Sequence, residues 1–185
     1  RAPGARQTLN STKLALIANQ AFSLVNFRGP LIADLVARDV AVFAFAPDFD
    51  DDIREKVRAL GATPVDYTLA RTGMNPARDI VDAARLARRL RDLRPDVCMA
   101  YAVKPSIYGS LAARVVGVPR CYPLVNGLGY AFLDDGSRHP RKLLARFVAR
   151  RLYRLAFAHT KRIFMQNQQD LDDFVRWGIA RPEKL

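Results

Sequence analysis

Two basic residues in this chain are placed where they could bind an anion together. Lys104 comes directly after an apolar run, 96–103, and Pro105 follows it at once. Arg28 ends a polar and aromatic segment that follows the first apolar run. If both runs are strands of one open α/β sheet, the two cations lie at the edge where such sheets bind ligands. The N–H groups of a helix that starts near Ser106 would add to the attraction for an anion. A phosphate or diphosphate suits this arrangement, although either cation alone could be a solvated surface residue.

A glycine-containing loop, Asn126-Gly-Leu-Gly129, could form a second part of this site. It differs from a dinucleotide-binding fingerprint, because it lacks the third glycine and follows the fifth predicted strand rather than the first. Two interpretations stay open: a turn that needs positive φ at Gly127 or Gly129, or a loop that lets a ligand approach the backbone while its asparagine amide bonds a sugar hydroxyl. Tyr108 and Tyr130 could add apolar faces for a sugar ring or could pack in the core or at the rim.

No residue is assigned as a catalytic acid, base or nucleophile. Neither a Ser-His-Asp or Cys-His arrangement nor a phosphate-binding P-loop is present, and Asp134 and Asp135 are consecutive, so their side chains point in different directions. Cys98 and Cys121 fall in predicted buried strands, where we expect reduced core thiols. The Cys and His residues lack the spacing of a metal site, so we predict no structural metal.

Alternating strands and helices position these residues. We predict strands at 13–18, 40–46, 63–67, 96–103, 120–125 and 161–166, and helices at 30–38, 50–60, 76–94, 105–116, 140–158 and 168–177. This alternation predicts an α/β fold, a Rossmann-like three-layer sandwich with a mostly parallel sheet of about six strands. The default strand order, 3-2-1-4-5-6, has its switch point between strands one and four. The ligand crevice should therefore lie between the loop 19–28 and the turn 101–105.

For two of these helices, the sequence also predicts which residues are buried or act as caps. The apolar side of helix 76–94 is expected to consist of Ile80, Ala83, Ala84, Ala87 and Leu90, with arginines on the other side. Helix 50–60 begins with three aspartates, 50–52, which suit the positive end of the helix dipole. We therefore interpret these aspartates as capping residues and not as metal ligands.

The segment 138–162 holds nine Lys or Arg residues and no acidic residue. On the helix expected there, one stripe consists of Lys142, Arg146, Arg150 and Arg154, and the roughly opposite face, which should dock on the sheet, consists of Leu144, Val148, Leu152 and Leu155. Leu143, Phe147 and Phe157 lie among or beside the cations, and such a stripe suits an anionic membrane surface. A solvated helix face is the simpler alternative. Nucleic acid is disfavoured, because no binding signature is present and the aromatic residues are not spaced as stacking platforms.

Length and charge limit the classes of protein to which this chain can belong. The chain has 185 residues, enough for one domain with a sizeable core, and its 30 Lys+Arg against 18 Asp+Glu give a net charge of +12. Such a charge implies an anionic partner, whether nucleic acid, a lipid surface or a phosphorylated ligand, unless it only reflects a GC-rich genome. No apolar run is long enough to predict a transmembrane helix. We expect residues 1–12 to be a disordered leader or a cloning remnant ahead of a domain at 13–185.

Several of these segments together resemble a known family. They are Phe22-Ser-Leu-Val-Asn-Phe-Arg-Gly-Pro-Leu-Ile32, Lys104-Pro-Ser-Ile-Tyr-Gly109, Asn126-Gly-Leu-Gly-Tyr-Ala-Phe132 and Phe164-Met-Gln-Asn-Gln-Gln-Asp170. From about Lys13 to its end, the chain resembles the N-terminal domain of a retaining family 4 glycosyltransferase of the GT-B architecture. It is most similar to the bacterial subgroup that extends polyprenyl-diphosphate-linked sugars for capsule, O-antigen or glycoprotein glycans.

The resemblance implies an enzyme that transfers a sugar from a nucleotide sugar, expected to be a UDP-sugar, to a lipid-linked saccharide. It implies that this chain is the acceptor-binding half, without turnover of its own, and that a second Rossmann-like domain beyond Leu185 holds the nucleotide sugar and a pair of glutamates. Neither a cofactor nor a metal is implied, because helix dipoles and basic residues hold the diphosphate in this architecture. The enzyme is expected to be cytoplasmic and peripheral, at the inner face of the bacterial plasma membrane.

The resemblance also places an acceptor site. Its expected residues are Asn19, Phe22, Arg28, Lys104, Pro105, Tyr108, Asn126, Gly127 and Gly129. Many members of the family carry a histidine where this chain has Lys104, so no catalytic base is assigned and Lys104 is expected to position the ligand. A different class of function stays open: a stand-alone nucleotide- or phosphate-binding α/β module without transferase activity, which would bind a nucleotide tightly.

Overall fold

The computed structural model describes residues 11–70, 76–127, 132 and 140–185. Its strands form one six-stranded parallel sheet in the order β3-β2-β1-β4-β5-β6. The strands are β1 (Lys13–Ile17), β2 (Ala41–Ala46), β3 (Thr63–Asp66), β4 (Val97–Tyr101), β5 (Arg120–Val125) and β6 (Phe164–Met165). Because β1 pairs with both β2 and β4, the predicted strand order and switch point are confirmed.

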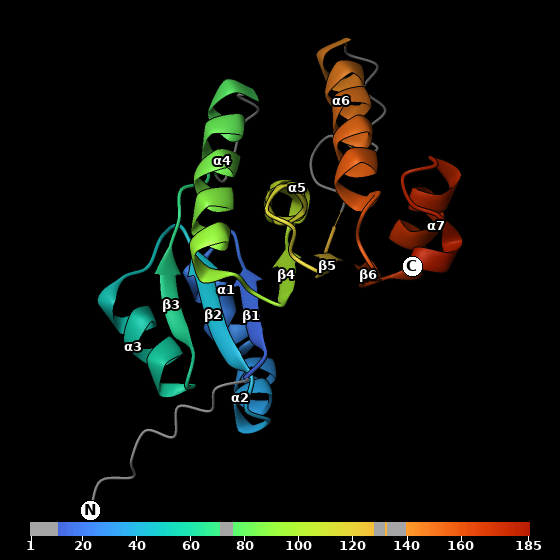
Figure 1. Ribbon diagram of the computed structural model, residues 1–185. Helices are drawn as coiled ribbons and strands as arrows, with labels where there is room; N and C mark the ends of the chain where they lie inside the picture. Colours follow the sequence, from blue (N-terminus) through green and yellow to red (C-terminus); the bar gives the residue numbers. More distant parts are fainter. Residues whose placement is uncertain (1–10, 71–75, 128–131, 133–139) are drawn as a thin grey trace, which may run out of the picture.

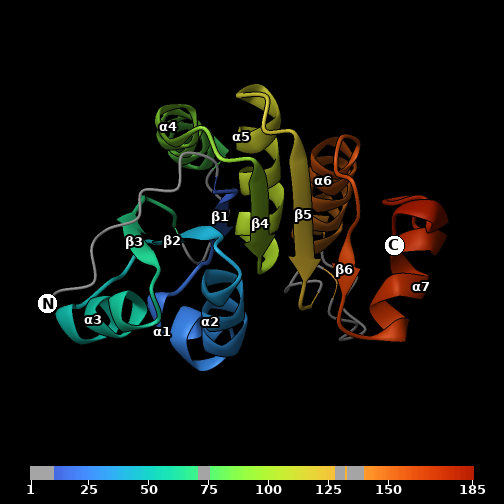
Figure 2. The same cartoon turned by 60° about the horizontal axis from the view of Figure 1, so that its bottom comes forward.

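Helices cover both faces of this sheet. They are α1 (Ala21–Asn26), α2 (Gly29–Ala37), α3 (Asp51–Ala59), α4 (Pro76–Leu93), α5 (Ser110–Val115), α6 (Pro140–Phe157) and α7 (Gln168–Arg176). Figures 1 and 2 show α1, α2 and α3 on one side of the sheet and α4, α5 and α6 on the other, with α7 beyond the β6 edge. The predicted three-layer sandwich is therefore confirmed.

Successive residues of β1 serve opposite layers. Leu16 packs in a buried cluster with residues of α1, α2 and α3, whereas its neighbour Ile17 packs in a second buried cluster with residues of α4 and α5. A parallel strand covered on both faces has no solvent side, so its sequence reads as a continuous apolar run. This is why the strands could be recognised without an alternating pattern.

The chain bends sharply after β4, as predicted, and the bend uses unusual backbone. Ala102 has φ 73°, which is uncommon for a residue with a Cβ atom. A π-helical turn, Pro105–Gly109, follows and leads directly into α5. A Cβ at Gly109 would lie 3.1 Å from Ala100 Cβ and 3.3 Å from Ile17 Cδ1. Any larger residue here would require Ala100 or Ile17 to shift by a few tenths of an ångström, because the turn packs directly on β1 and β4 at the switch point.

The predicted loop 19–28 contains a helix, α1, so this part of the prediction is wrong. The N–H of Ala21 donates a hydrogen bond of 2.7 Å to the Asp48 carboxylate, and Ser23 and Leu24 are buried. A six-residue helix is too short to be stable by its own propensity. It forms because a residue that follows β2 caps it and because the sheet buries one side of it, and neither cause is visible in the local sequence.

Helix α4 presents a different face to the sheet than its apolar pattern predicts. Leu90 is buried as expected, but Ile80 is 66% exposed and Ala84 is exposed. In their place, Asp79 and Asp82 are buried, each with 3% of its surface exposed. Hydropathy assigns carboxylates to solvent, because a charged group is buried only where it finds partners. The first turns of α4 find such partners at the carboxyl edge of the sheet.

The edge strand β6 is shorter than the predicted strand 161–166. It pairs with β5 only through Leu124 and Val125. Next to it, the N–H of Ile163 donates a hydrogen bond of 2.7 Å to the carbonyl of Lys184 near the end of the chain. The main chain just before β6 thus bonds to the C-terminal residues through Ile163 and to β5 through Lys161, whose N–H donates to the Cys121 carbonyl at 3.0 Å.

Two smaller predictions about buried and capping residues are confirmed. Asp50 caps α3, since its carboxylate accepts a hydrogen bond of 2.7 Å from the N–H of Ile53. Cys98 and Cys121 are buried free thiols, directly opposite each other on β4 and β5.

Candidate functional site

The two segments that flank the switch point meet at the carboxyl edge of the sheet. Ser23 lies on α1, directly after β1, and Tyr101 is the last residue of β4. Their hydroxyl oxygens lie 2.8 Å apart in a buried hydrogen bond. Residues 19–28 and the turn 101–105 are therefore in contact, as the predicted topology requires.

Arg28 is held at this edge by an aromatic ring. Its guanidinium carbon lies 4.8 Å from the centroid of the Tyr101 ring, and Nη1 donates to the carbonyl of Phe27 at 3.1 Å. Its Nε is buried and has no hydrogen-bond partner among the described residues. Burial raises the pKa of Tyr101 to about 12, although the Ser23 hydrogen bond and the Arg28 charge act in the opposite direction. Tyr101 thus stays neutral below that pH and holds a cation that still has unused donors.

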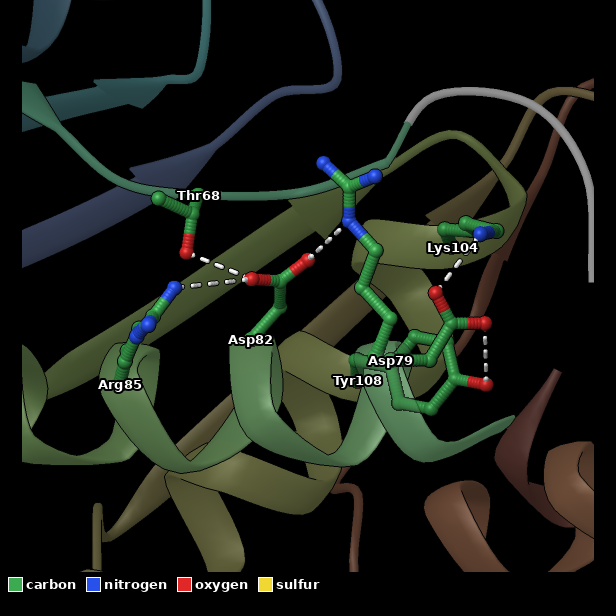
Figure 3. A network of polar contacts seen from close by, with 7 residues as sticks. Thr68, Asp79, Asp82, Arg85, Lys104 and Tyr108 are labelled. Carbon is green, nitrogen blue, oxygen red and sulfur yellow. Dashed lines mark hydrogen bonds and ion pairs between the residues drawn. The ribbon is translucent and has the colours of Figure 1, made fainter. Parts of the chain in front are cut away.

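Lys104 is also at this edge, but it carries a partner that the sequence did not indicate. Its Nζ donates to Asp79 Oδ1 at 2.8 Å, and the Tyr108 hydroxyl donates to Asp79 Oδ2 at 3.1 Å (Figure 3). The Asp79 side chain is 4% exposed and that of Lys104 15%. Burial, followed by the Asp79 carboxylate, raises the pKa of Tyr108, so its hydroxyl remains a hydrogen-bond donor.

A second buried carboxylate lies one turn further along α4. Asp82 Oδ1 accepts a hydrogen bond of 2.7 Å from the Thr68 hydroxyl, which follows β3. Arg78 and Arg85 approach the same carboxylate at 4.0 and 3.7 Å from the exposed side of α4 (Figure 3). Asp82 thus joins α4 to the segment after β3, and it is separate from the Lys104 pair.

The backbone N–H of Ser106 is not free to bind an anion. The N–H of Ser106 donates to the carbonyl of Ala102 at 2.9 Å, so the predicted contribution of this N–H group is wrong. The Ser106 hydroxyl lies 3.2 Å from the Ala100 carbonyl and 3.1 Å from the Leu124 carbonyl, and ties β4 to β5. Pro105 is buried and shapes the turn.

The remaining predicted site residues differ in exposure. Phe22 is 54% exposed and packs edge-on against Phe27, with ring centroids 5.9 Å apart. Asn19 is half-buried, and Asn126 is exposed at the end of β5. Gly127 has φ 130°, as the turn interpretation of this loop requires. Gly129, Tyr130, Asp134 and Asp135 lie outside the described residues.

Half of the cationic stripe expected on α6 packs against the end of α7. The Arg150 guanidinium carbon lies 4.7 Å from the centroid of the Trp177 ring. Arg154 donates hydrogen bonds to the carbonyls of Trp177 and Gly178, the latter at 2.7 Å. The side chain of Lys142 lies outside the described residues. Arg150 and Arg154 therefore join α6 to α7, a role that the sequence did not indicate.

The apolar face predicted for α6 is wrong at two positions. Leu144 is 62% and Leu155 52% exposed, whereas Tyr153 and Phe157 are buried in the cluster that α6 shares with α7. The face shifts because α7 and the π-helical turn both pack on α6, and helical periodicity alone cannot show this. Exposed apolar side chains remain near the start of the helix, at Leu143, Leu144 and Phe147.

The part of the chain that the structure describes lacks two other kinds of site. Within the described ranges, no helix is both long enough and apolar enough to cross a bilayer. The same ranges contain no group of three or more His, Cys, Asp or Glu residues that could hold a metal ion.

Comparison with known proteins places this edge within a family. Residues 28–185 match the sequence profile of the glycosyl transferase 4-like domain. The chain belongs to this family. The match includes Arg28, Lys104 and Asp79, and it confirms the resemblance inferred from the sequence motifs.

A curated relative in this family carries a functional name. The chain is 29% identical over 167 residues to N,N'-diacetylbacillosaminyl-diphospho-undecaprenol alpha-1,3-N-acetylgalactosaminyltransferase of Campylobacter jejuni. The aligned region covers 90% of this glycosyl transferase 4-like chain and 43% of the relative. The chain thus spans less than half the length of the relative.

Solved structures with similar folds include glycosyltransferases and epimerases. MurG of Acinetobacter baumannii has a TM-score of 0.56 at 12% identity, over 85% of this chain and 41% of its own. The lipopolysaccharide outer core galactosyltransferase WaaB also has a TM-score of 0.56 at 12% identity, over 91% and 43%. A putative UDP-N-acetylglucosamine 2-epimerase of Listeria monocytogenes has a TM-score of 0.60 at 12% identity, over 95% and 44%. At such low identity, these similarities show the fold alone.

Proposed function

We propose that this glycosyl transferase 4-like domain binds the acceptor in an enzyme that transfers a sugar from a UDP-sugar to a lipid-linked saccharide. The observation that carries the proposal is the placement of Arg28 and Lys104. They lie on the two segments that meet at the switch point of the sheet, where open α/β folds bind ligands. The Campylobacter jejuni relative, whose name specifies an undecaprenol-diphosphate-linked sugar, supports a lipid-linked acceptor.

The edge offers groups of the kind that a sugar diphosphate requires. Arg28 and Lys104 bind phosphate or sugar oxygens, because both are donors at the end of the central strands. At the end of the neighbouring strand β5, the exposed amide of Asn126 and the backbone of Gly127 shape the acceptor pocket together with Gly129.

Catalysis in this proposal depends on a second domain. That domain holds the nucleotide sugar and the catalytic glutamates, and transfer proceeds with retention of configuration and without a metal or cofactor. The present chain has no turnover on its own, since none of its residues is assigned to the transfer step.

The proposal also includes the place where the enzyme works. A lipid-linked acceptor is embedded in a bilayer, and the products are capsule, O-antigen or another cell-surface glycan. The chain has a net charge of +12, and exposed apolar side chains lie beside the basic residues of α6. Such a surface fits peripheral binding at the anionic inner face of a bacterial plasma membrane.

Liposome binding by the 185-residue chain tests the acceptor role. One set of liposomes carries undecaprenyl-diphosphate N-acetylglucosamine, and a matched set carries the same charge as phosphatidylglycerol. We expect tighter binding to the first set, and Arg28→Met and Lys104→Met should each abolish the difference. Arg114→Met, which removes an exposed arginine on α5, is the matched control and should leave the difference intact.

The outcome that contradicts the proposal is equally specific. If the two liposome sets bind alike while the chain alone binds UDP tightly, the chain is a stand-alone nucleotide-binding module.

A further inference from the structure

We infer that Lys104, held by Asp79 together with Tyr108, recognises uncharged sugar hydroxyls, whereas Arg28 recognises the phosphate. This inference rests on the proposed function and divides its site into two parts. Asp79 is the positioning residue of the sugar part, since it reaches the ligand through Lys104 and Tyr108. Neither its role nor this division is indicated by the sequence motifs.

The charge around Lys104 disfavours an anion. The ammonium lies 2.8 Å from the Asp79 carboxylate, so the pair is neutral as a whole. A phosphate that approaches Lys104 also approaches the negative charge of Asp79. The repulsion between the phosphate and the Asp79 carboxylate therefore offsets the attraction between the phosphate and the Lys104 ammonium. A sugar hydroxyl has no charge, so the Asp79 carboxylate does not repel it.

Arg28 has the opposite surroundings. It stacks on Tyr101 and donates to a backbone carbonyl, and among the described residues no carboxylate forms an ion pair with it. Its positive charge is therefore not offset by a direct partner, and guanidinium donors match the oxygens of a phosphate. Of the two cations at the edge, Arg28 is the one suited to an anion.

The hydrogen-bonding groups of the sugar part match a hydroxyl and not a phosphate. Lys104 has three N–H donors, of which Asp79 occupies one. Tyr108 donates its proton to Asp79, so its oxygen can only accept further hydrogen bonds. A sugar hydroxyl both accepts and donates and can satisfy both side chains, whereas a phosphate dianion can only accept.

Exposure supports the separation of positioning from contact. Asp79 has 4% of its side chain exposed, whereas Lys104 has 15% exposed and Tyr108 is half-buried. A ligand can therefore touch Lys104 and Tyr108 but not the carboxylate that orients them. Both oxygens of Asp79 are occupied, which fixes the two side chains relative to each other before a ligand arrives.

Titration of the isotope-labelled chain with two small probes tests the inference by NMR. The probes are inorganic diphosphate and the methyl glycoside of N-acetylglucosamine. In the wild-type chain, the sugar should shift the signals of Lys104 and Tyr108, and diphosphate those of Arg28. Asp79→Asn keeps the shape but removes the charge, so it should strengthen diphosphate binding and weaken sugar binding, each by about threefold to tenfold.

Two further variants separate this effect from damage to the fold. Arg28→Met should weaken diphosphate binding and leave sugar binding unchanged. Asp82→Asn, at an equally buried carboxylate on the same helix that bonds Thr68, should change neither affinity. Opposite shifts of the two affinities in Asp79→Asn support the inference, because a loosened fold would weaken both.

Each of the following outcomes would overturn the inference. If Asp79→Asn weakens both probes equally, or lowers thermal stability without changing either affinity, Asp79 has only a structural role. If diphosphate binds at Arg28 but the sugar does not shift Lys104 or Tyr108, the division of the site is wrong while the proposed acceptor function stands. If neither probe shifts any residue of the edge, the proposed acceptor site fails, and the inference fails with it.

Discussion

The hydroxyl of Ser23 lies 2.8 Å from the hydroxyl of Tyr101, and this hydrogen bond joins α1 to the end of β4. It holds together the two segments that meet at the switch point. The same tyrosine ring supports Arg28, so one side chain both closes the edge and positions its half-buried cation.

Replacing Tyr101 by Phe should lower the free energy of unfolding by about 1 kcal/mol, because a buried hydrogen bond is lost while Ser23 still donates to the Gln20 carbonyl. Tyr101→Ala should cost about 3–5 kcal/mol, since it also leaves a cavity. Urea unfolding monitored by circular dichroism measures both. Tyr122→Phe on β5 is the control, and an equal loss there would show that the Ser23 bond contributes nothing.

The close packing of Gly109 predicts a sharp response to an added methyl group. Gly109→Ala should destabilise the chain by about 1–3 kcal/mol, because the new Cβ would lie 3.1 Å from Ala100 Cβ. Gly29→Ala on α2 is the matched helical control: its Cβ would meet nothing closer than 3.7 Å, and the change should be neutral or slightly stabilising. Equal unfolding midpoints in urea for the two variants would contradict this reading of the bend.

High pH should unfold the protein through its buried tyrosines. The pKa of Tyr101 is raised by burial to about 12 in the folded state, against 10.0 for an exposed tyrosine. Its contribution to stability is therefore complete below about pH 10 and is lost as the pH rises towards 12. Burial raises the pKa of Tyr67 and Tyr153 in the same direction. Urea unfolding measured as the pH rises from about 10 towards 12 should show a falling free energy of unfolding, and the fall should be shallower in Tyr101→Phe. A free energy of unfolding that does not change over this pH range would refute the prediction.

The exposed start of α6 predicts a membrane-binding phenotype without loss of fold. Leu144→Glu and Phe147→Glu should each weaken binding to anionic liposomes by roughly tenfold, because each replaces an exposed apolar side chain by a charge of the wrong sign. Thermal stability should be unchanged. Val115→Glu, at a position 71% exposed on α5, is the control. If the control weakens binding as much as the α6 variants, the effect is one of net charge and not of this helix.

The same structure shows why the basic stripe itself is a poor target for charge reversal. Arg154 donates to carbonyls at the end of α7, and Arg150 stacks on Trp177. Reversing these charges would disturb the packing of α7 on α6, so weaker membrane binding would not have a single cause. Leu144 and Phe147 avoid this difficulty because they are exposed.

The sequence was sufficient for the sheet because its parallel strands are covered on both faces. The apolar runs of β1 and β4 are continuous, and alternation with helices leaves few possible topologies. The position of Lys104 after β4 followed from that order. Helix α1 could not be predicted, because its cap comes from Asp48, at the end of a different strand.

The polar contacts of the site were missed for a related reason. Asp79 lies in the first turn of a helix rich in charge, and a hydropathy pattern places such a residue in solvent. Its burial depends on Lys104 and Tyr108, which lie 25 and 29 residues further along the chain. Partners at that separation are brought together by the fold, and local sequence contains no sign of them.

Asp79 also has a mechanical consequence for the edge. It belongs to α4, which precedes β4 in the chain, whereas Lys104 and Tyr108 both belong to the bend that follows β4. Because one carboxylate holds both side chains, α4 cannot slide over the sheet or unwind its first turn without releasing the two together. A displacement of α4 that breaks these two hydrogen bonds would therefore release the Lys104 ammonium and the Tyr108 phenol at the acceptor edge at the same time.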